Sequence, residues 1–259
     1  MRYRLLTIFM TALTIVTYGQ DADQLNKESK DYLTKKDFKN AFPLLEKAAN
    51  LGQPEAQYNL GLCYQDGIQT EKNDSIANYW YLKSAEQGWT DSQFKISYSY
   101  ATGRGTKVDT QKAFYWTQKC AEQNDYDCIF NLISCYKDGF GTQKNADKVI
   151  EWAVILARQE NPDDLSKSGK ITSARLNLAF MYRDGQEIKK DLIESYKWFL
   201  LYNEGKKDFS FFQQQNVVGQ IRELEKQLTK KDIEKAKELA EKTIGRQLKN
   251  LDNLYKAET

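Results

Sequence analysis

A short phrase of a small residue, Leu or Ile, Tyr and Gly at fixed spacing occurs four times in this chain of 259 residues. A repeat of this length is typical of stacked supersecondary units, so it constrains the fold more than any local preference does. Four tryptophans keep the same steps along the chain as the tyrosines of the phrase. The tyrosines are Tyr64, Tyr100, Tyr136 and Tyr182, and the tryptophans are Trp80, Trp116, Trp152 and Trp198.

Each copy of the repeat predicts two helices joined by a loop. In the first copy, Ala56, Leu60 and Tyr64 recur every four residues and form one apolar stripe. The glycine three residues after each tyrosine should end that helix, because only Gly takes the left-handed conformation without strain. An Asn or Asp then caps the second helix, which carries the Trp inward. The expected stops are Gly67, Gly103, Gly139 and Gly185, and the expected caps are Asp37, Asn73, Asp109, Asn145 and Asp191.

Composition agrees with an all-helical chain and narrows the function. Only three prolines occur, and each is expected at a helix boundary: Pro43, Pro54 and Pro162. Histidine is absent, which removes the commonest general base and metal ligand. The formal net charge is +2 with both signs spread evenly, which argues against a partner such as nucleic acid or an anionic membrane. We therefore predict no catalytic residue, no metal and no cofactor.

The first residues have the pattern of a secretory signal. Arg2 and Arg4 precede an apolar run over residues 5–16, which is shorter than the ~20 residues that span a bilayer. We expect residues 1–19 to be removed as a signal peptide, with an uncleaved interfacial anchor as the alternative. The mature chain would then be periplasmic or extracellular, with no integral membrane span.

The repeated residues resemble the Sel-one-like repeat family, a relative of the tetratricopeptide repeat. The family pattern Ala-x-x-x-Leu-Gly-x-x-Tyr-x-x-Gly, followed by Lys-Ala-x-x-Trp-x-x-Lys-Ala, is carried in the first full copy by Ala56, Leu60, Gly61, Tyr64, Gly67, Ala77, Trp80, Lys83 and Ala85. The resemblance implies an all-α, right-handed superhelical solenoid of stacked antiparallel helix pairs.

The expected organisation along the chain follows from where the repeat register holds. Residues 37–205 would form the array, residues 20–36 a tetratricopeptide-like helix, and residues 206–259 a helical cap with Thr229 as an N-cap between two charged helices. The last repeat step is ten residues longer than the others. We expect those extra residues to form a polar loop between Trp152 and Ala174.

The four cysteines fall into two pairs. Cys63 and Cys135 occupy the same repeat position two copies apart. Stacked helices lie ~8–10 Å apart, so this separation exceeds the reach of a disulfide and predicts buried free thiols. Cys120 and Cys128 have the spacing of the Cys-x7-Cys bridges in the family's cysteine-rich branch, and the resemblance implies a disulfide between them. The alternative is that both are small packing residues.

The cysteine-rich branch of the family has been associated with β-lactam hydrolysis, so serine motifs need to be weighed. Ser92 with Lys95 and Ser134 with Lys137 both have Ser-x-x-Lys spacing, and Lys167 begins a Lys-Ser-Gly sequence. Ser92 stands at a small packing position of the repeat, and such short patterns recur by chance. A β-lactamase-like envelope hydrolase therefore remains an alternative rather than the main hypothesis.

A second stripe of apolar and aromatic residues lies off the main stripe on each first helix. In tetratricopeptide arrays the equivalent face lines the concave groove, so we predict that a monomeric, non-catalytic scaffold binds a peptide or helix of another protein there. Burial of these side chains between neighbouring repeats is the alternative left open, and a cell-wall glycan is the alternative ligand. The predicted face is Tyr58, Leu62, Gln65, Phe94, Tyr98, Phe130, Ser134, Lys137, Leu176, Phe180 and Arg183.

Overall fold

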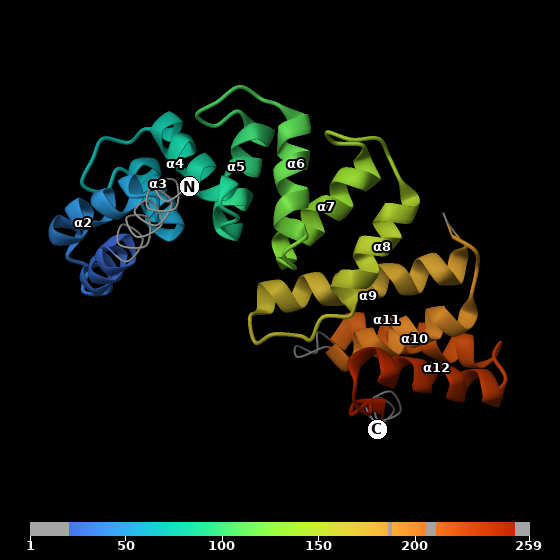
Figure 1. Cartoon of the computed structure of the whole chain (residues 1–259). Coiled ribbons are helices and arrows are strands. Elements are labelled where there is room, and N and C mark those ends of the chain that lie inside the picture. The colour runs from blue at the N-terminus through green and yellow to red at the C-terminus, as the bar shows by residue number, and fades with distance from the viewer. Residues whose placement is uncertain (1–20, 186–187, 206–210, 252–259) are drawn as a thin grey trace, which may run out of the picture. The chain divides into compact units, whose positions relative to one another are not determined.

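The computed structural model describes residues 21–185, 188–205 and 211–251. These residues form helices joined by loops, and no strand occurs among them. The chain divides into two compact units, Met1–Asp125 and Tyr126–Thr259, whose helices are labelled in Figure 1. The expected signal segment, residues 1–19, lies outside the part of the chain that the structure describes.

The first unit is a series of helix hairpins. A helix over residues 21–34 is followed by five more helices, and from α2 to α6 each helix packs against the next along the chain. They are α2 (Phe38–Asn50), α3 (Pro54–Asp66), α4 (Asp74–Glu86), α5 (Thr90–Thr102) and α6 (Thr110–Ala121). The expected all-α arrangement of packed helix pairs is therefore found in this unit.

The second unit continues the same pattern and then departs from it. Helix α9 packs against α7, α8 and α10, while α11 and α12 both pack against α10. The helices are α7 (Tyr126–Asp138), α8 (Ala146–Ala157), α9 (Leu165–Asp184), α10 (Leu192–Gly205), α11 (Phe211–Glu225) and α12 (Lys230–Ile244). The two helices expected near the C-terminus are thus present, and α10 is the element that they cover.

The expected helix stops and caps are confirmed. Gly67 ends α3 with φ of 75°, and the side chain of Asn73 accepts hydrogen bonds from the first free amides of α4, those of Ser75 and Ile76. Thr229 forms a capping box with Asp232 at the start of α12. The remaining stops also have positive φ, at Gly103, Gly139 and Gly185, and the remaining caps are Asp37, Asp109, Asn145 and Asp191.

The tryptophans of the repeat do not all have the same environment. Trp80, Trp116 and Trp198 are buried, whereas Trp152 is only half-buried. Trp80 belongs to a core cluster with Leu45 and residues of α3. The repeat register therefore predicts the position of each tryptophan on its second helix, and the neighbouring side chains set how deeply it is buried.

The two helices of a repeat approach closely by pairing a small residue with a large one. A Cβ atom on Gly61 would lie 2.5 Å from the ring of Tyr81, a contact that real Cβ atoms do not make. In the third copy the larger residue is instead on the first helix. The residues at the equivalent positions of the later copies are Ser97 and Thr117, Ile133 and Ala153, and Ala179 and Phe199. Dense packing in the helix pair requires this compensation of volumes.

A second recurring contact joins three of the first helices, α3, α5 and α9, to the end of the preceding helix. The side-chain amide of Gln57 donates to the carbonyl of Ala49 at 3.1 Å, and Gln93 donates to Ala85 at 3.2 Å. Arg175 occupies the same repeat position and donates through Nε to the carbonyl of Ala157 at 2.9 Å. These donors bind carbonyls in the last turn of the preceding helix, where the regular hydrogen bonds of the helix end.

Arg175 extends this contact further than the glutamines do. It also donates to the carbonyls of Gln159 and Leu201, at 2.9 Å and 3.1 Å, and it is buried. Burial, reinforced by the nearby charge of Arg246, lowers the pKa of Arg175 to about 10. The arginine therefore remains a cation at neutral pH and connects the ends of α8 and α10 through three hydrogen bonds.

The four cysteines differ in their bonding state. Cys63 and Cys135 are free and buried, which confirms that expectation. Cys120 and Cys128 are both disulfide-bonded. At the corresponding positions one repeat earlier, the hydroxyl of Ser92 donates to Oγ of Ser84 at 2.8 Å.

Two expectations about helix boundaries were wrong. Pro43 lies inside α2 rather than at its end, and this is tolerated because Pro43 and Lys39 are exposed, so that water can bind the carbonyl left unpaired. The ten-residue insertion is only partly a loop. Asp164 caps α9 by accepting from the amide of Lys167 at 3.0 Å, and much of the insertion therefore forms the first turns of this 20-residue helix.

Candidate functional site

Each unit has a pocket that is lined in part by the first helices of its repeats. The first pocket, of about 290 Å³, is formed in the first unit by the end of α3, by α4 and α5, and by the loop that follows α5. The second pocket, of about 390 Å³, is formed in the second unit by α7, α8 and α9. Several of their lining residues occupy the same positions of the repeat, such as Tyr98 and Phe180.

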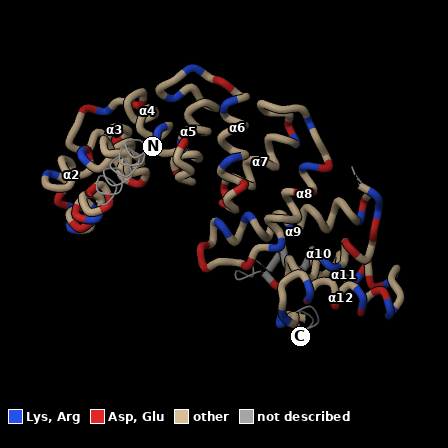
Figure 2. The backbone as a smooth tube through the Cα atoms, viewed as in Figure 1, with Lys and Arg blue, Asp and Glu red and all other residues tan. Residues whose placement is uncertain are grey.

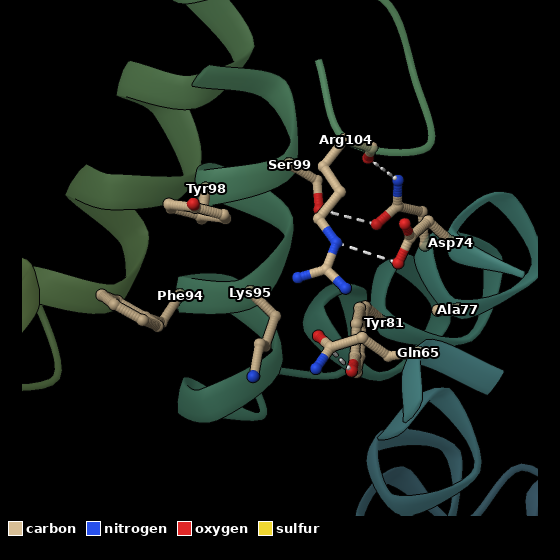
Figure 3. A pocket seen from close by; sticks show the side chains of 10 residues that line it. Gln65, Asp74, Ala77, Tyr81, Phe94, Lys95, Tyr98, Ser99 and Arg104 are labelled. Carbon is tan, nitrogen blue, oxygen red and sulfur yellow. Dashed lines mark hydrogen bonds and ion pairs between the residues drawn. The ribbon is translucent and has the colours of Figure 1, made fainter. Parts of the chain in front are cut away.

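A polar network holds the loop after α5 against α4 in the first pocket (Figure 3). The side-chain amide of Asn78 donates to the carbonyl of Arg104 at 2.7 Å, and the hydroxyl of Ser99 donates to Oδ1 of Asn78 at 2.7 Å. Nε of Arg104 donates to Oδ1 of Asp74 at 2.9 Å. Two of these hydrogen bonds thus hold Arg104, one at its backbone and one at its side chain, and the third orients Asn78.

Gly105 allows this loop to come close to α4. Its φ is +67°, and an added Cβ would lie 2.4 Å from the backbone carbon of Asp74. Ser75 supports the same approach, because its hydroxyl donates to the carbonyl of Gly105 at 2.9 Å. The glycine is therefore required by both its backbone conformation and the lack of space, and it determines where Arg104 lies.

Aromatic residues form another part of the first pocket. Tyr81 is buried, and its hydroxyl donates to Oε1 of Gln65 at 3.1 Å. Burial is the main cause that raises the pKa of Tyr81 well above its ordinary value, so this hydroxyl stays protonated. Tyr98 on α5 is by contrast 52% exposed, and Phe94 lies one turn before it on the same helix. The pocket therefore has a fixed polar base and an accessible aromatic rim.

The second pocket has more aliphatic side chains in its lining than the first. Ile133, Val149, Ala153 and Met181 line it, and Ala153 stands where the first pocket has the large ring of Tyr81. The smaller side chain leaves a wider apolar space at this position. Lys137 and Asp184 supply one charge of each sign.

The rim of the second pocket is held by aromatic and cationic contacts. The rings of Phe180 and Phe199 meet edge to face with centroids 5.3 Å apart. The guanidinium of Arg183 lies 4.7 Å from the centroid of Phe180 and pairs with Asp184 at 2.6 Å. These contacts keep Phe180 in place at the edge of the pocket.

The structure separates the predicted binding face into two groups. Seven of its residues line a pocket, namely Gln65, Phe94 and Tyr98 in the first and Phe130, Ser134, Lys137 and Phe180 in the second. Tyr58 and Leu62 instead pack, partly buried, against the core cluster that contains Tyr81. Arg183 lies beside the second pocket through its contact with Phe180, and Leu176 is half-buried and lines neither pocket.

Sequence reasoning missed the charged residues of the first pocket. Asp74, Lys95 and Arg104 all line it, and Arg104 belongs to the Gly-Arg-Gly loop, whose glycines the sequence explains as helix stops. The sequence offered one signal, an arginine between two glycines. The structure adds that both glycines have positive φ. Its partner Asp74 is 30 residues earlier, a distance at which local patterns identify no contact.

The serine motifs show no nucleophile activated by a base. Ser92 is buried and bonded to Ser84, so a substrate cannot reach it. Ser134 donates to the carbonyl of Phe130 at 3.3 Å within its own helix, although both Ser134 and Lys137 line the second pocket. Nζ of Lys167 lies 5.8 Å from the ring centroid of Tyr126. These contacts are typical of helix packing rather than of a hydrolytic site.

Figure 2 shows basic and acidic residues interspersed along the described chain. A search of the described helices finds none with the length and apolar character needed to cross a bilayer.

Repeated helix hairpins, with a pocket in each unit, define an α-helical repeat protein. The Sel1 repeat model of this class matches more than half of the sequence, and the chain belongs to the Sel1 repeat family. The matched segments are residues 29–53, 54–89, 90–125, 129–161, 172–201 and 218–244. They include α12 and part of the segment before residue 37, beyond the array that the tyrosines and tryptophans delimit.

Two solved structures are similar to this chain. A Sel1 repeat protein from Oxalobacter formigenes is 23% identical with a TM-score of 0.61, over 84% of this chain and 99% of that chain. A protective antigen present in uropathogenic Escherichia coli strains, displaying an SLR fold, is 22% identical with a TM-score of 0.44, over 90% of this chain and 55% of that chain. The first likeness supports the fold. Among curated proteins, none matches the sequence.

Proposed function

We propose that this protein is an exported, non-catalytic scaffold that binds segments of another protein through the pocket of each unit. Sel1 repeats typically mediate protein interactions, and helical repeat arrays use extended surfaces of this kind for binding. Each pocket would take a side chain of the partner.

One observation carries the proposal: in each unit, an exposed aromatic side chain on the first helix of a repeat borders the pocket. Tyr98 borders the first pocket and Phe130 the second, and both are exposed. Aromatic side chains at the edge of a pocket supply much of the energy of protein interfaces, because they bury a large area with few rotatable bonds. The face is therefore suited to a peptide or helix rather than to a small reactive substrate.

Other features favour binding over catalysis and export over retention. The chain contains no histidine, and the serine of the first Ser-x-x-Lys motif, Ser92, is buried. The apolar run after Arg2 and Arg4 supports export. Disulfide bonding at Cys120 and Cys128 agrees with an oxidising compartment.

Two pairs of alanine variants, one pair at the pockets and one control pair, test the proposal. We expect Tyr98→Ala and Phe130→Ala to abolish capture of the partner that the unaltered chain retains from envelope extract. Tyr79→Ala and Tyr115→Ala are the controls, because these tyrosines are 52% and 51% exposed but lie on the second helices. Their variants should capture the same partner at the unaltered level.

The same variants distinguish the alternative ligands. Capture that depends on Tyr79 and Tyr115 but not on Tyr98 and Phe130 would contradict the proposed face. Cosedimentation with purified insoluble cell-wall glycan, lost only in the second-helix variants, would instead support a glycan binder.

A further inference from the structure

We propose that the first pocket binds an acidic side chain of the partner, next to an apolar or aromatic residue of the same segment. This inference rests on the proposed function and specifies the chemistry of the segment that is bound. It is carried by two cations that the pocket holds with only one carboxylate among its lining residues.

Arg104 provides the first of these cations. Its Nε is occupied by Asp74, while its two terminal nitrogens make no hydrogen bond to the described residues. Figure 3 shows the guanidinium turned into the pocket, and its side chain is 38% exposed. A guanidinium with two free, parallel donors binds a carboxylate in a bidentate manner.

The position of Arg104 is set before any ligand binds. Asn78 binds its carbonyl, Gly105 lets the loop approach Asp74, and Asp74 fixes the inner nitrogen of the guanidinium. Little side-chain freedom is therefore lost when an anion binds. Such preorganisation increases affinity without adding any contact.

Lys95 provides the second cation. It lies on α5, lines the same pocket and is half-buried. It forms no ion pair with the described residues. With Asp74, Lys95 and Arg104 as the charged groups, the lining carries one more positive than negative charge. An aspartate or glutamate of the partner would balance this charge.

The aromatic rim indicates what accompanies the acidic residue. Phe94 and Tyr98 line the pocket from the same helix as Lys95, and Tyr98 is exposed. Successive residues of an extended segment are ~3.3–3.6 Å apart, so a neighbour of the bound acid can reach the rings. The recognised feature is thus an acidic residue beside an apolar or aromatic one.

The second pocket is an internal comparison for this chemistry. Asn177 occupies the repeat position of Lys95 there, and the charges of Lys137 and Asp184 balance each other. We therefore expect acidic selectivity to come from the first pocket alone, with the second pocket selecting an apolar side chain.

Phage-displayed random dodecapeptides, selected on the full chain, test the inference. We expect enrichment of Asp or Glu beside aromatic or aliphatic residues. A selected acidic peptide, labelled for fluorescence anisotropy, should bind Lys95→Gln and Arg104→Gln roughly tenfold more weakly than the unaltered chain. Lys107→Gln is the matched control, because it removes an exposed charge from the same loop outside the pocket and should leave affinity unchanged.

Charge reversal provides a second variant that does not disturb the loop. Lys95→Glu should lose the acidic enrichment and select peptides with Lys or Arg instead. Enriched peptides without acidic residues, or an acidic peptide that binds Lys95→Gln and Lys95→Glu unchanged, would overturn the acidic inference alone. Failure to enrich any peptide whose binding depends on Tyr98 and Phe130 would overturn the proposed function as well.

Discussion

The pocket of the first unit and the pocket of the second unit use corresponding repeat positions for different chemistry. Gln65 and Tyr81 of the first correspond to Lys137 and Ala153 of the second. The first pocket thus has more charged side chains, and the second is larger and has more aliphatic ones. The repeat fixes where a side chain lies, and the residue type at that position sets what the pocket can bind.

The core positions below the pockets differ between units in the same compensating way. Gly61 makes room for Tyr81, whereas Ile133 and Ala153 hold the equivalent positions in the second unit, where both line the pocket. Gln93 binds one carbonyl of the preceding helix end, and Arg175 binds three. One architecture is therefore stabilised by different side chains in its two parts.

The largest expected effect concerns the arginine that replaces glutamine in the second unit. Arg175→Leu should lower the free energy of unfolding by about 3–5 kcal/mol, because three carbonyls lose their donor. Gln93→Leu removes one such bond and should cost only about 1 kcal/mol. Urea denaturation measures both, and equal effects of the two variants would contradict the difference drawn between the units.

The loop that positions Arg104 comes next. Gly105→Ala should lower the free energy of unfolding by about 2–4 kcal/mol, because the new Cβ meets the backbone of Asp74 and φ is positive. Gly88→Ala is the control: its φ is +89°, but nothing lies within 4 Å of the added Cβ. It should cost about 1 kcal/mol. A similar cost for both would show that strain alone, and not the docked loop, requires Gly105.

Exchange of the volume pair tests the compensation between helices. Gly61→Ala should cost about 1–3 kcal/mol, because the Cβ meets the ring of Tyr81. In a double-mutant cycle with Tyr81→Ala, the double variant should be more stable than the sum of the single effects predicts. Strict additivity would contradict direct compensation.

The smallest expected effect is a pH dependence shared by both units. Burial, with a smaller contribution from Asp66 or Asp138, raises the pKa of Cys63 and of Cys135 to about 11. An unfolded thiol has a pKa of about 8.5. The neutral thiols therefore favour the native state fully below that value, and this contribution is lost as pH rises from about 8.5 to 11.

Thiol modification and unfolding measurements check this dependence. Iodoacetamide should react slowly with the native chain at pH 8 and with both thiols after unfolding. Cys63→Ala and Cys135→Ala should each reduce the alkaline loss of stability. Rapid modification of the native chain would show that these thiols are accessible.

Local chemistry made much of the fold predictable. Gly67 and Asn73 could be assigned from sequence because a helix stop and an N-cap depend on the residue and its nearest neighbours along the chain. Trp80 and its equivalents followed from the repeat period. The position of Pro43 was misjudged, since its tolerance depends on exposure of the carbonyl four residues earlier.

The candidate site was predictable only in part. Tyr98 and Phe130 could be placed on the pocket face from helical periodicity. Tyr58 lies on the same stripe but packs against the core, because the ring of Tyr81 on the second helix fills the space beside it. Periodicity defines the face of a helix but not what the neighbouring helix brings against it.

The sequence alone determined the repeating unit, its helix pairs and their ends, because these depend on spacing and on local backbone chemistry. Only the tertiary structure decided that Arg104 would lie beside Asp74 and Lys95 in one pocket. That arrangement depends on the close approach of Gly105 to a helix 30 residues earlier in the chain. Contacts of this kind arise from packing between repeats, where volumes and hydrogen bonds must be satisfied together.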